Sequence, residues 1–509
     1  MRLKRRFVLY LMVAPLLCYG TDFYISPEGK DTDSGLSPDE AWKCIENINT
    51  KDLEPGDRLL FQGGRIFAGK ITLDKRDNGT ISRPILITSY GAGRAVIDGG
   101  EKEGLFFDQC EHVLVRDINF KGAGRKNGNT RSGLHLSDVR DVQIDSAEVC
   151  GFQKSGIFVE NGSDVRVMRV FAHDNGFAGI YVGSDFKKAK NISISFCLAE
   201  NNPGDPTNKT NHSGNGILMG GVDGGVIEYC AATNNGWDMP REGNGPVGIW
   251  AYNSNNVIIQ HNISHHNKTS PEGKDGGGFD FDGGMTNSVM QYNFSYNNEG
   301  AGFGLYQYSG AGTWKDNVFR YNISVNDGWK NGQCGIHVWA AEGNEETMSD
   351  AMIYNNTIVN DLGHAVGYLT DISGLIYRNN IFITGDSQIY GPYQSSCFEN
   401  NLYWSSGDTG ILVDGYRSME EWSTATGQEM RGNVPLGLEG DPLLVREENE
   451  EYPFDPTKLS ALAAFKLTPA SPCVGTGLFI LDNGGRDFWG ENLPQNGEKP
   501  DIGAHQLTR

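Results

Sequence analysis

The sequence predicts an all-β protein that folds as a right-handed parallel β-helix solenoid, with an N-terminal helical cap and an irregular C-terminal segment. Three observations predict this fold. Glycine makes up 68 of 509 residues, about 13% against a usual share of roughly 7%, which is typical of many short strands and tight turns. Short alternating apolar segments recur along the middle of the chain. Small polar residues follow most of these segments at similar positions.

The repeated unit is a four-residue strand whose first and third residues are apolar. Its six clearest copies are residues 180–183, 217–220, 249–252, 279–282, 303–306 and 336–339. Neighbouring copies start 24 to 37 residues apart, and so short a unit cannot bury its apolar face alone. Stacked coils bury it together, and parallel crossovers are almost always right-handed. A β-propeller is the rival prediction, but its blades of about 40–50 residues are longer than this coil.

An asparagine follows the second strand of several repeats. The asparagines that share this place are Asn262, Asn293, Asn322 and Asn356. We predict that they stack as an internal ladder, because a buried amide at a turn can satisfy backbone groups of the adjacent coils. Cys197 and Cys230 occupy the same place in their repeats.

The two ends of the chain differ from the repeats. Residues 1–20 have a basic start, an apolar run and a small final residue, which is the layout of a secretory signal. The run is shorter than the about 20 residues of a membrane span. We therefore expect a secreted or periplasmic protein, with a surface lipoprotein attached through Cys18 as the alternative.

The rest of the chain divides into three parts. Residues 21–100 are predicted to form an N-terminal cap and first strands, with a helix signal at 37–46 that begins at Ser37 and Pro38. Residues 101–435 are predicted to form the coils. Residues 436–509 are expected to pack back on the coils.

The net charge and the spacing of the cysteines exclude some classes of partner and site. With 43 basic and 64 acidic residues the net charge is −21, which repels phosphate backbones and anionic membranes. We expect no nucleic-acid partner, no membrane span and a monomer. The eight cysteines after Cys18 lack metal-site spacing. The four in apolar strand-like runs are predicted to be buried small hydrophobes, and they are Cys110, Cys150, Cys197 and Cys230.

The second and fourth positions of the repeats are predicted to face water, because alternate residues of a strand point to opposite sides. Those positions carry Tyr181, Leu218, Trp250, Tyr252, Asp280, Asp282, Tyr306, His337 and Trp339. Loops at 202–214, 235–247, 266–278, 327–335 and 341–350 are expected to wall a groove beside this stripe. They are expected to bring toward it Trp237, Arg241, Glu242, Lys274, Asp275 and Glu342.

Residues 275–284 hold the densest chemical signal, because two aspartates stand in strand positions where aspartate is depleted. We predict that Asp280 and Asp282 are the acid and the base or nucleophile of a glycosidic cleavage, with His337 as a further catalytic candidate. The predicted substrate-binding residues are Trp250, Tyr252, Tyr306, Trp339 and Asp275. Two alternatives stay open. One is a Ca²⁺ site of Asp275, Asp280 and Asp282, with no other cofactor expected, and the other is a solvated strand with Asp-Gly turns.

Motifs at both ends resemble those of the secreted right-handed β-helix proteins of the pectate-lyase-like superfamily. The opening residues 23–31 with Pro55, Gly56 and Asp57 are similar to that group's N-terminal cap, and residues 470–473, 484–487 and 500–504 resemble its C-terminal segment. Many members degrade polysaccharides. The chain lacks the Asn-Thr-Asp, Asp-Asp, Gly-His-Gly and Arg-Ile-Lys set of the polygalacturonase-like hydrolases, and it has no stripe lysine or arginine to act as a lyase base.

The resemblance and the residues together predict a secreted carbohydrate-active enzyme. The leading prediction is a glycoside hydrolase acting on a polysaccharide or oligosaccharide. The first alternative is a Ca²⁺-dependent polysaccharide lyase acting on a uronate-containing glycan, and the second is a non-catalytic glycan-binding solenoid.

Overall fold

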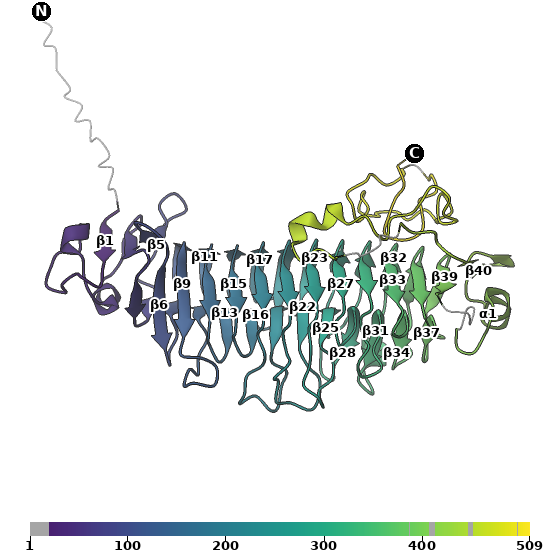
Figure 1. The fold of residues 1–509 in the computed structure, drawn as a ribbon, viewed down its shortest axis with the longest axis horizontal. Coiled ribbons are helices and arrows are strands. Elements are labelled where there is room, and N and C mark those ends of the chain that lie inside the picture. Colours follow the sequence, from purple (N-terminus) through teal and green to yellow (C-terminus); the bar gives the residue numbers. More distant parts are fainter. Residues whose placement is uncertain (1–19, 386, 407–412, 446–450, 496, 509) are drawn as a thin grey trace, which may run out of the picture.

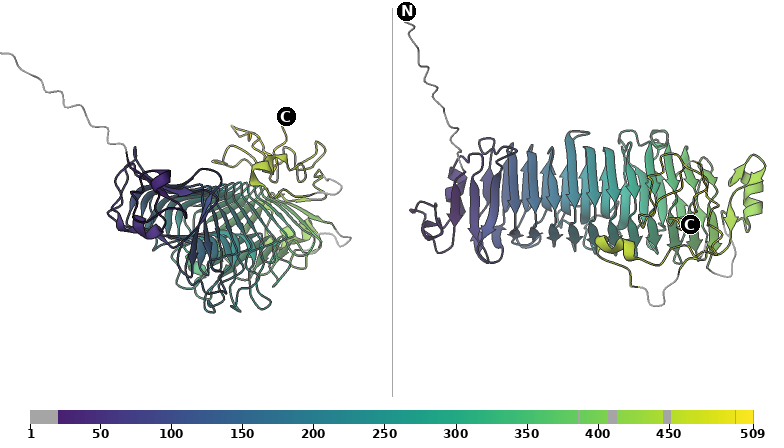
Figure 2. Two further views of the ribbon diagram at one scale, coloured as in Figure 1. Left: turned by 60° about the vertical axis from the view of Figure 1, so that its left-hand side comes forward. Right: turned by 90° about the horizontal axis from the view of Figure 1, so that it is seen from above.

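Three long parallel sheets wind around one axis in the computed structural model (Figures 1 and 2). The structure describes residues 20–385, 387–406, 413–445, 451–495 and 497–508. Each strand pairs in parallel with the strand one coil before it and the strand one coil after it, so the predicted parallel β-helix is confirmed. The signal predicted over residues 1–20, including Cys18, lies outside the described residues except for its last position.

The sheets are numbered 1 to 3 for reference, and in each coil the chain passes from sheet 1 to sheet 3 and then to sheet 2. Sheet 1 consists of β1 (Asp22–Ile25), β2 (Arg58–Gln62), β5 (Ile85–Tyr90), β8 (Glu111–Arg116), β11 (Arg140–Asp145), β14 (Arg166–Met168), β17 (Ala189–Ser195), β20 (Val222–Glu228), β23 (Asn255–Gln260), β26 (Val289–Gln291), β29 (Asn317–Arg320), β32 (Ala351–Tyr354), β35 (Leu375–Arg378) and β38 (Cys397–Glu399). Sheet 2 consists of β4 (Ile71–Leu73), β7 (Leu105–Asp108), β10 (Leu134–Ser137), β13 (Ser155–Glu160), β16 (Ala178–Gly183), β19 (Asn215–Gly220), β22 (Val247–Tyr252), β25 (Gly277–Phe281), β28 (Phe303–Gln307), β31 (Ile336–Ala340), β34 (Val366–Tyr368) and β37 (Ile389–Tyr390). Sheet 3 consists of β3 (Ile66–Ala68), β6 (Ala95–Gly100), β9 (Ile118–Gly122), β12 (Glu148–Cys150), β15 (Phe171–His173), β18 (Leu198–Glu200), β21 (Ala231–Thr233), β24 (Ile263–His265), β27 (Phe294–Tyr296), β30 (Ile323–Val325), β33 (Thr357–Asn360), β36 (Ile381–Thr384), β39 (Leu402–Ser405) and β42 (Leu438–Glu439).

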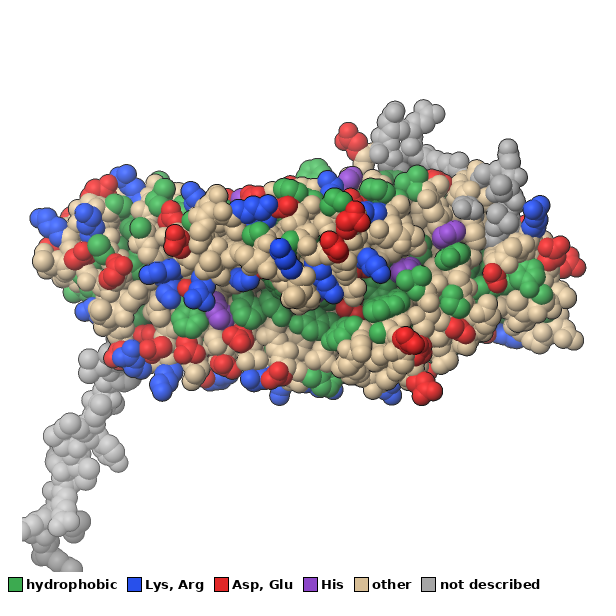
Figure 3. Space-filling view, turned by 90° about the horizontal axis from the view of Figure 1, so that it is seen from below, with side chains coloured by type: hydrophobic (Ala, Val, Ile, Leu, Met, Phe, Trp, Pro, Cys, Tyr) green, Lys and Arg blue, Asp and Glu red, His purple; other side chains and the backbone are tan. Residues whose placement is uncertain are grey.

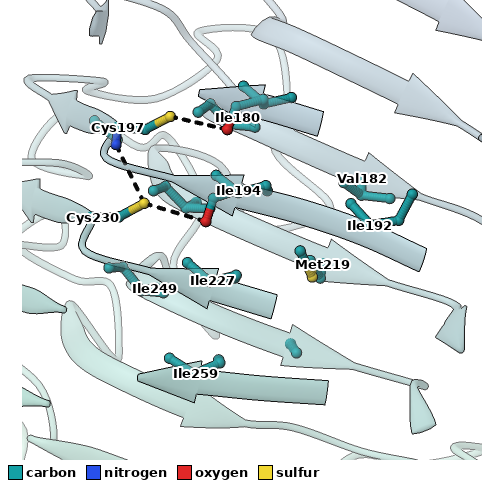
Figure 4. Packing of buried hydrophobic residues seen from close by; sticks show 14 of the residues in the cluster. Ile180, Val182, Ile192, Ile194, Cys197, Met219, Ile227, Cys230, Ile249 and Ile259 are labelled. Atoms are coloured by element: carbon teal, nitrogen blue, oxygen red, sulfur yellow. Dashed lines mark hydrogen bonds between the residues drawn. The ribbon is translucent and has the colours of Figure 1, made fainter. Parts of the chain in front are cut away.

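The interior of the coils is filled by the apolar positions of the repeat. Phe279 and Phe281 of β25 are 1% and 0% exposed and belong to one continuous core, as the alternation predicts. Figure 4 shows this core around Cys197 and Cys230, which lie among isoleucine, valine and methionine side chains. Cys110 is also buried, whereas the prediction is wrong for Cys150, which is partly exposed on the outer face of sheet 3.

The predicted asparagine ladder is present and is longer than expected. Each amide Nδ2 and backbone N–H donates to the Oδ1 of the next asparagine toward the C-terminus. This first ladder runs through Asn262, Asn293, Asn322, Asn356, Asn380 and Asn401. Cys230 and Cys197 extend it upstream: Cys230 N–H donates to Asn262 Oδ1 at 2.8 Å, and Cys197 N–H donates to Cys230 Sγ at 3.4 Å.

A second ladder, which the sequence analysis missed, follows another turn. It runs in the same direction through Asn175, Asn202, Asn235, Asn267 and Asn298. Both ladders end in a carboxylate, Asp327 in the second and Glu429 in the first. Every rung donates toward this end, so the last side chain only has to accept, which the oxygens of a carboxyl group can do.

Glu429 makes stability depend on pH. Burial raises its pKa from 4.5 to about 7, so the folded protein holds a proton that the unfolded chain releases near 4.5. Stability from this proton is complete below that pH and is lost as pH rises through about 7. We expect the melting temperature to fall over this window less steeply in Glu429→Gln than in wild type. The shift in pKa corresponds to a pH-dependent loss of about 3 kcal/mol in the free energy of unfolding of wild type, which the variant lacks.

Thermal unfolding of both proteins between pH 4.5 and 8 measures this difference. Equal slopes in the two proteins would contradict it.

The two ends of the solenoid are closed in different ways. The predicted N-terminal helix is two short 3₁₀ turns, η1 (Pro38–Glu40) and η2 (Ile45–Thr50). The Ser37 side chain makes no capping hydrogen bond, so the predicted helix start at this residue is not formed. Ile45 and Ile48 of η2 are nevertheless buried in the core and cover its first coil.

The C-terminal end holds α1 (Met419–Thr426) and the hairpin of β40 (Met430–Arg431) and β41 (Val434–Pro435). The chain after them turns back along the coils (yellow in Figures 1 and 2). There η4 (Pro456–Ala461) and the residues after it cover the outer face of sheet 3, where Phe465 packs with Phe294. No described helix is long and apolar enough to cross a membrane.

Candidate active site

A cavity of about 420 Å³ opens on the outer face of sheet 2, over β22, β25, β28 and β31. Figure 3 views the molecule from this side and shows a hollow floored by hydrophobic side chains. The residues that line the cavity are Asn211, His212, Arg241, Asn244, Gly245, Val247, Trp250, Tyr252, Lys274, Asp275, Asp280, Asp282, Tyr306, Tyr308, Gln333, His337, Trp339 and Leu369.

The structure brings all eight predicted site residues to this one cavity. Strand register explains why. Trp250 pairs with Asp280, Asp280 with Gly304, and Gly304 with His337, so these residues form one row across four coils. Tyr306 pairs with Trp339 in the row beside it.

The prediction that these side chains face water is wrong for several of them. Asp280 is 2% exposed, His337 3% and Trp250 4%. Leu218, also expected outside, is fully buried beneath Val247 and Trp250. The loops before the strands cover the outer face, so positions that point away from the core are buried a second time.

Asp280 is the most perturbed acid of the site. Its Oδ1 is buried without a hydrogen-bond partner among the described residues. Burial, followed by the charges of Asp282 and Asp275, raises the pKa of Asp280 well above 3.8. A carboxyl group in this setting keeps its proton at neutral pH and can donate it to a ligand.

Asp282 and Asp275, unlike Asp280, accept hydrogen bonds from protein donors. Asp282 accepts from the Gly283 N–H at 2.7 Å and is partly open to the cavity. Burial raises its pKa to about 7. Asp275 accepts from the Gly245 N–H at 2.7 Å and from Gln333 Nε2 at 2.9 Å, which ties together three loops.

Tyr306 and His337 form a neutral pair on the cavity floor. Tyr306 Oη lies 3.1 Å from His337 Nδ1. Burial raises the pKa of Tyr306 well above 10 and lowers the pKa of His337 to about 4. At neutral pH the phenol keeps its proton and the imidazole is uncharged, so both suit hydrogen bonding to hydroxyl groups.

The sequence analysis missed further cavity residues, all of which lie in loops except Val247, the first residue of β22. These are Asn211, His212, Asn244, Gly245, Val247, Tyr308, Gln333 and Leu369. The His212 ring packs edge-on against Trp250 at 5.0 Å. Of the loop residues that were expected here, Arg241, Lys274 and Asp275 line the cavity, but Trp237, Glu242 and Glu342 do not. Trp237 instead donates to Asn201 Oδ1 beside sheet 3.

The three aspartates do not match a calcium site as they stand. Among the described residues, the only group of three or more His, Cys, Asp or Glu side chains with ligand atoms within 4.8 Å of one another lies elsewhere, at Glu148, Cys150 and His173. Both oxygens of Asp275 are already occupied by hydrogen bonds. The donor positions of this cavity therefore fit acid and base chemistry better than the oxygen cage that Ca²⁺ requires.

Three comparisons relate the chain to known proteins. The lacto-N-biosidase of Bifidobacterium longum subsp. longum is 24% identical over 72% of this chain and 29% of that protein, so the chain spans less than a third of that relative. The crystal structure of the GH136 lacto-N-biosidase from Eubacterium ramulus, as its selenomethionine derivative, matches with a TM-score of 0.51 and 17% identity over 70% of this chain and 67% of the other. The PL6 family alginate lyase AlyGC matches with a TM-score of 0.53 and 12% identity over 80% of this chain and 54% of the other. These structural likenesses concern the fold.

The family comparison covers more than half of the chain. The profile of the Pel9A-like right-handed β-helix region matches residues 23–344, which include strands β2 to β31 and most of the cavity-lining residues. The chain belongs to the Pel9A-like right-handed β-helix family.

Proposed function

We propose that this protein is a glycoside hydrolase that cleaves an oligosaccharide or polysaccharide in the cavity on sheet 2. The observation that carries the proposal is the unequal pair of neighbouring acids. Asp280 is buried, unpartnered and protonated, and Asp282 is hydrogen-bonded and more readily ionised. Two carboxyl groups whose pKa values are driven apart supply the acid and the base or nucleophile of glycoside hydrolysis.

In this proposal Asp280 donates its proton to the glycosidic oxygen as the bond to the anomeric carbon breaks. Asp282 supplies the ionised carboxylate, which either attacks the anomeric carbon or removes a proton from the attacking water. The anomeric configuration of the first product, read by NMR, distinguishes the two routes.

The other lining residues suit a sugar ligand. Trp250, Tyr252 and Trp339 offer apolar ring surface to the C–H faces of a sugar, and Tyr306 and His337 offer hydrogen bonds. The cavity of about 420 Å³ falls in the range of ligand pockets, about 300–1,000 Å³. The relative named lacto-N-biosidase supports a glycosidase and an oligosaccharide substrate.

A second candidate is a polysaccharide lyase, which the cations Arg241 and Lys274 at the cavity favour. Either could neutralise a uronate carboxylate or take the proton that elimination removes. A lyase releases an unsaturated sugar that absorbs ultraviolet light, whereas a hydrolase consumes water and releases a saturated one.

The experiment is a screen of the purified protein against neutral and uronate-containing glycans, including oligosaccharides that end in lacto-N-biose, with and without chelator. We expect a saturated product and no effect of chelator. Asp282→Asn should lower kcat by about 10³-fold or more without unfolding the protein. Asp108→Asn on the same sheet, outside the cavity lining, is the matched control. Unsaturated product, or full activity in Asp282→Asn, would overturn the proposal.

Gly304 provides a further test of the cavity floor. A Cβ there would lie 2.7 Å from the Tyr306 ring and 3.0 Å from Asp280 Oδ1, so a methyl group would enter the space beside the proposed proton donor. We expect Gly304→Ala to lower kcat/KM by about 10- to 100-fold and, because the Tyr306 ring must shift to make room, to destabilise the fold by about 1–3 kcal/mol. Gly363→Ala is the control, because a Cβ there meets no atom closer than 3.5 Å. Equal kcat/KM in the two variants would contradict this position for the substrate.

A further inference from the structure

A second cluster of reactive side chains lies on the outer face of sheet 3, away from the cavity. Glu148 and Cys150 are two residues apart on β12, so both point outward. Cys150 pairs in register with His173 on β15 of the next coil. One carboxylate oxygen, the Cys150 Sγ and an imidazole nitrogen all lie within 4.8 Å of one another.

The surroundings hold the histidine in the orientation that a metal ligand needs. His173 Nδ1 lies 2.7 Å from Asp174 Oδ2, and its Nε2 faces Glu148 Oε1 at 3.2 Å. The ring stacks on Phe171 at 4.2 Å. A carboxylate on one ring nitrogen fixes the tautomer and leaves the other nitrogen free to coordinate, as in many zinc sites.

The glutamate is oriented as well. Asn119 Nδ2 donates to Glu148 Oε2 at 3.2 Å, and the Glu148 N–H donates to Asn119 Oδ1 at 3.1 Å. The second carboxylate oxygen, Oε1, is thereby left toward His173 and Cys150.

From this geometry we propose that Glu148, Cys150 and His173 bind one zinc ion, or a similar divalent transition metal, which bridges two adjacent coils. Sulfur, nitrogen and oxygen donors together suit zinc, whereas Ca²⁺ and Mg²⁺ take oxygen ligands. The 3.2 Å between Nε2 and Oε1 matches the edge of a zinc tetrahedron, about 3.3 Å for bonds near 2.0 Å. The thiolate and the carboxylate offset the charge of the ion.

The fourth coordination position is left to water. Glu148 is 43% exposed and His173 18%, so the ion can enter from solvent without unfolding the coil. The C-terminal segment packs on later strands of the same face, from Ile263 onward. Because the ligands come from neighbouring coils, the bound ion stabilises the stack in its N-terminal third, and it acts independently of the proposed glycan cleavage.

The test uses the full-length protein, reduced and stripped of metal. We expect it to bind one equivalent of Co²⁺ with a thiolate-to-cobalt charge-transfer band, and Zn²⁺ to displace the cobalt and raise the melting temperature. Cys150→Ser should abolish the band and the thermal shift. Asp174→Asn should weaken zinc binding by about 10- to 100-fold, the usual effect of losing an outer-shell partner. Cys397→Ser, which removes another exposed thiol, should behave as wild type.

A second measurement needs no variant. Zn²⁺ should protect Cys150 of the wild-type protein from alkylation, as followed by peptide mass spectrometry. The proposal is overturned by zinc affinity that is unchanged in Cys150→Ser, by a cobalt spectrum without the thiolate band, or by equal alkylation of Cys150 with and without zinc. None of these outcomes depends on glycan cleavage, so the hydrolase proposal stands or falls separately.

Discussion

Asp280→Asn is expected to lose about 10²- to 10⁴-fold in kcat on a natural glycan, the range for removal of a general acid. The amide has the shape of the carboxyl group but no acidic proton for the leaving oxygen. The loss should be much smaller on an aryl glycoside with an acidic phenol, because that leaving group departs without protonation. Measuring both substrates therefore separates a proton donor from a residue that only shapes the cavity.

Asp282→Asn provides the contrast, because a missing nucleophile or base impairs both substrates alike. Equal losses on both substrates in Asp280→Asn would remove the proton-donor role from that residue. Full activity of Asp280→Asn on the natural glycan would show that the buried carboxyl takes no part in the chemistry.

The pH profile follows from the same pair. Asp282 must be ionised and Asp280 protonated, so kcat/KM should rise as Asp282 loses its proton and fall again as Asp280 does. Because burial raises the pKa of Asp282 from the ordinary 3.8 to about 7, the acid limb of the profile should lie near that pH. Asp280→Asn should lose the alkaline limb and keep the acid one, which a rate–pH series of both proteins on the natural glycan measures.

Asn293→Ala is expected to destabilise the fold by about 4 kcal/mol, at the upper end of single substitutions. Its amide is fully buried. Its Oδ1 accepts from Asn262, and its Nδ2 donates to Asn322 Oδ1 and to the Ile259 carbonyl. Truncation leaves buried donors of Asn262 and the carbonyl of Ile259 unpaired, and each such group costs about 1–3 kcal/mol.

Denaturant unfolding, together with hydrogen exchange of the coils around this rung, measures the loss. Asn293→Cys should cost less than alanine, because Cys230 fills the same slot and its sulfur accepts from the Cys197 N–H. Asn492→Ala, at an exposed position, should leave stability unchanged. If alanine at 293 were as stable as wild type, the ladder would be no more than a packing feature.

The fold could be read from the sequence because its signals are local and repeated. Alternation placed Phe279 and Phe281 inside, and the shared slot of Asn262 and Asn293 predicted their hydrogen bond one coil apart. The same alternation gathered Asp280, His337 and the aromatic residues at one place, since residues at equal positions of stacked strands become neighbours.

The burial of the site and its loop residues could not be predicted from the sequence, because both depend on the paths of irregular loops. Alternation alone cannot tell an outer face in solvent from one roofed by loops, which is why the burial of Trp250 and Leu218 was missed. His212 and Gln333 lie in irregular segments whose paths no periodicity fixes. Cys150 and His173 stand at equal positions of adjacent coils, but the repeats recognised in the sequence did not include these two strands, so the pair was missed.

The one-way hydrogen bonding of the two ladders has a consequence for how such solenoids change in length. The Oδ1 of each inner asparagine accepts two hydrogen bonds from the asparagine of the preceding coil. Its backbone N–H and Nδ2 donate the same two bonds to the asparagine of the following coil. A whole turn can therefore be duplicated or deleted between two rungs with the bonding restored at the new junction. Growth in whole turns requires nothing new at Asp327 or Glu429, whereas a partial turn breaks the series, so inserted residues are best accommodated in the loops between strands.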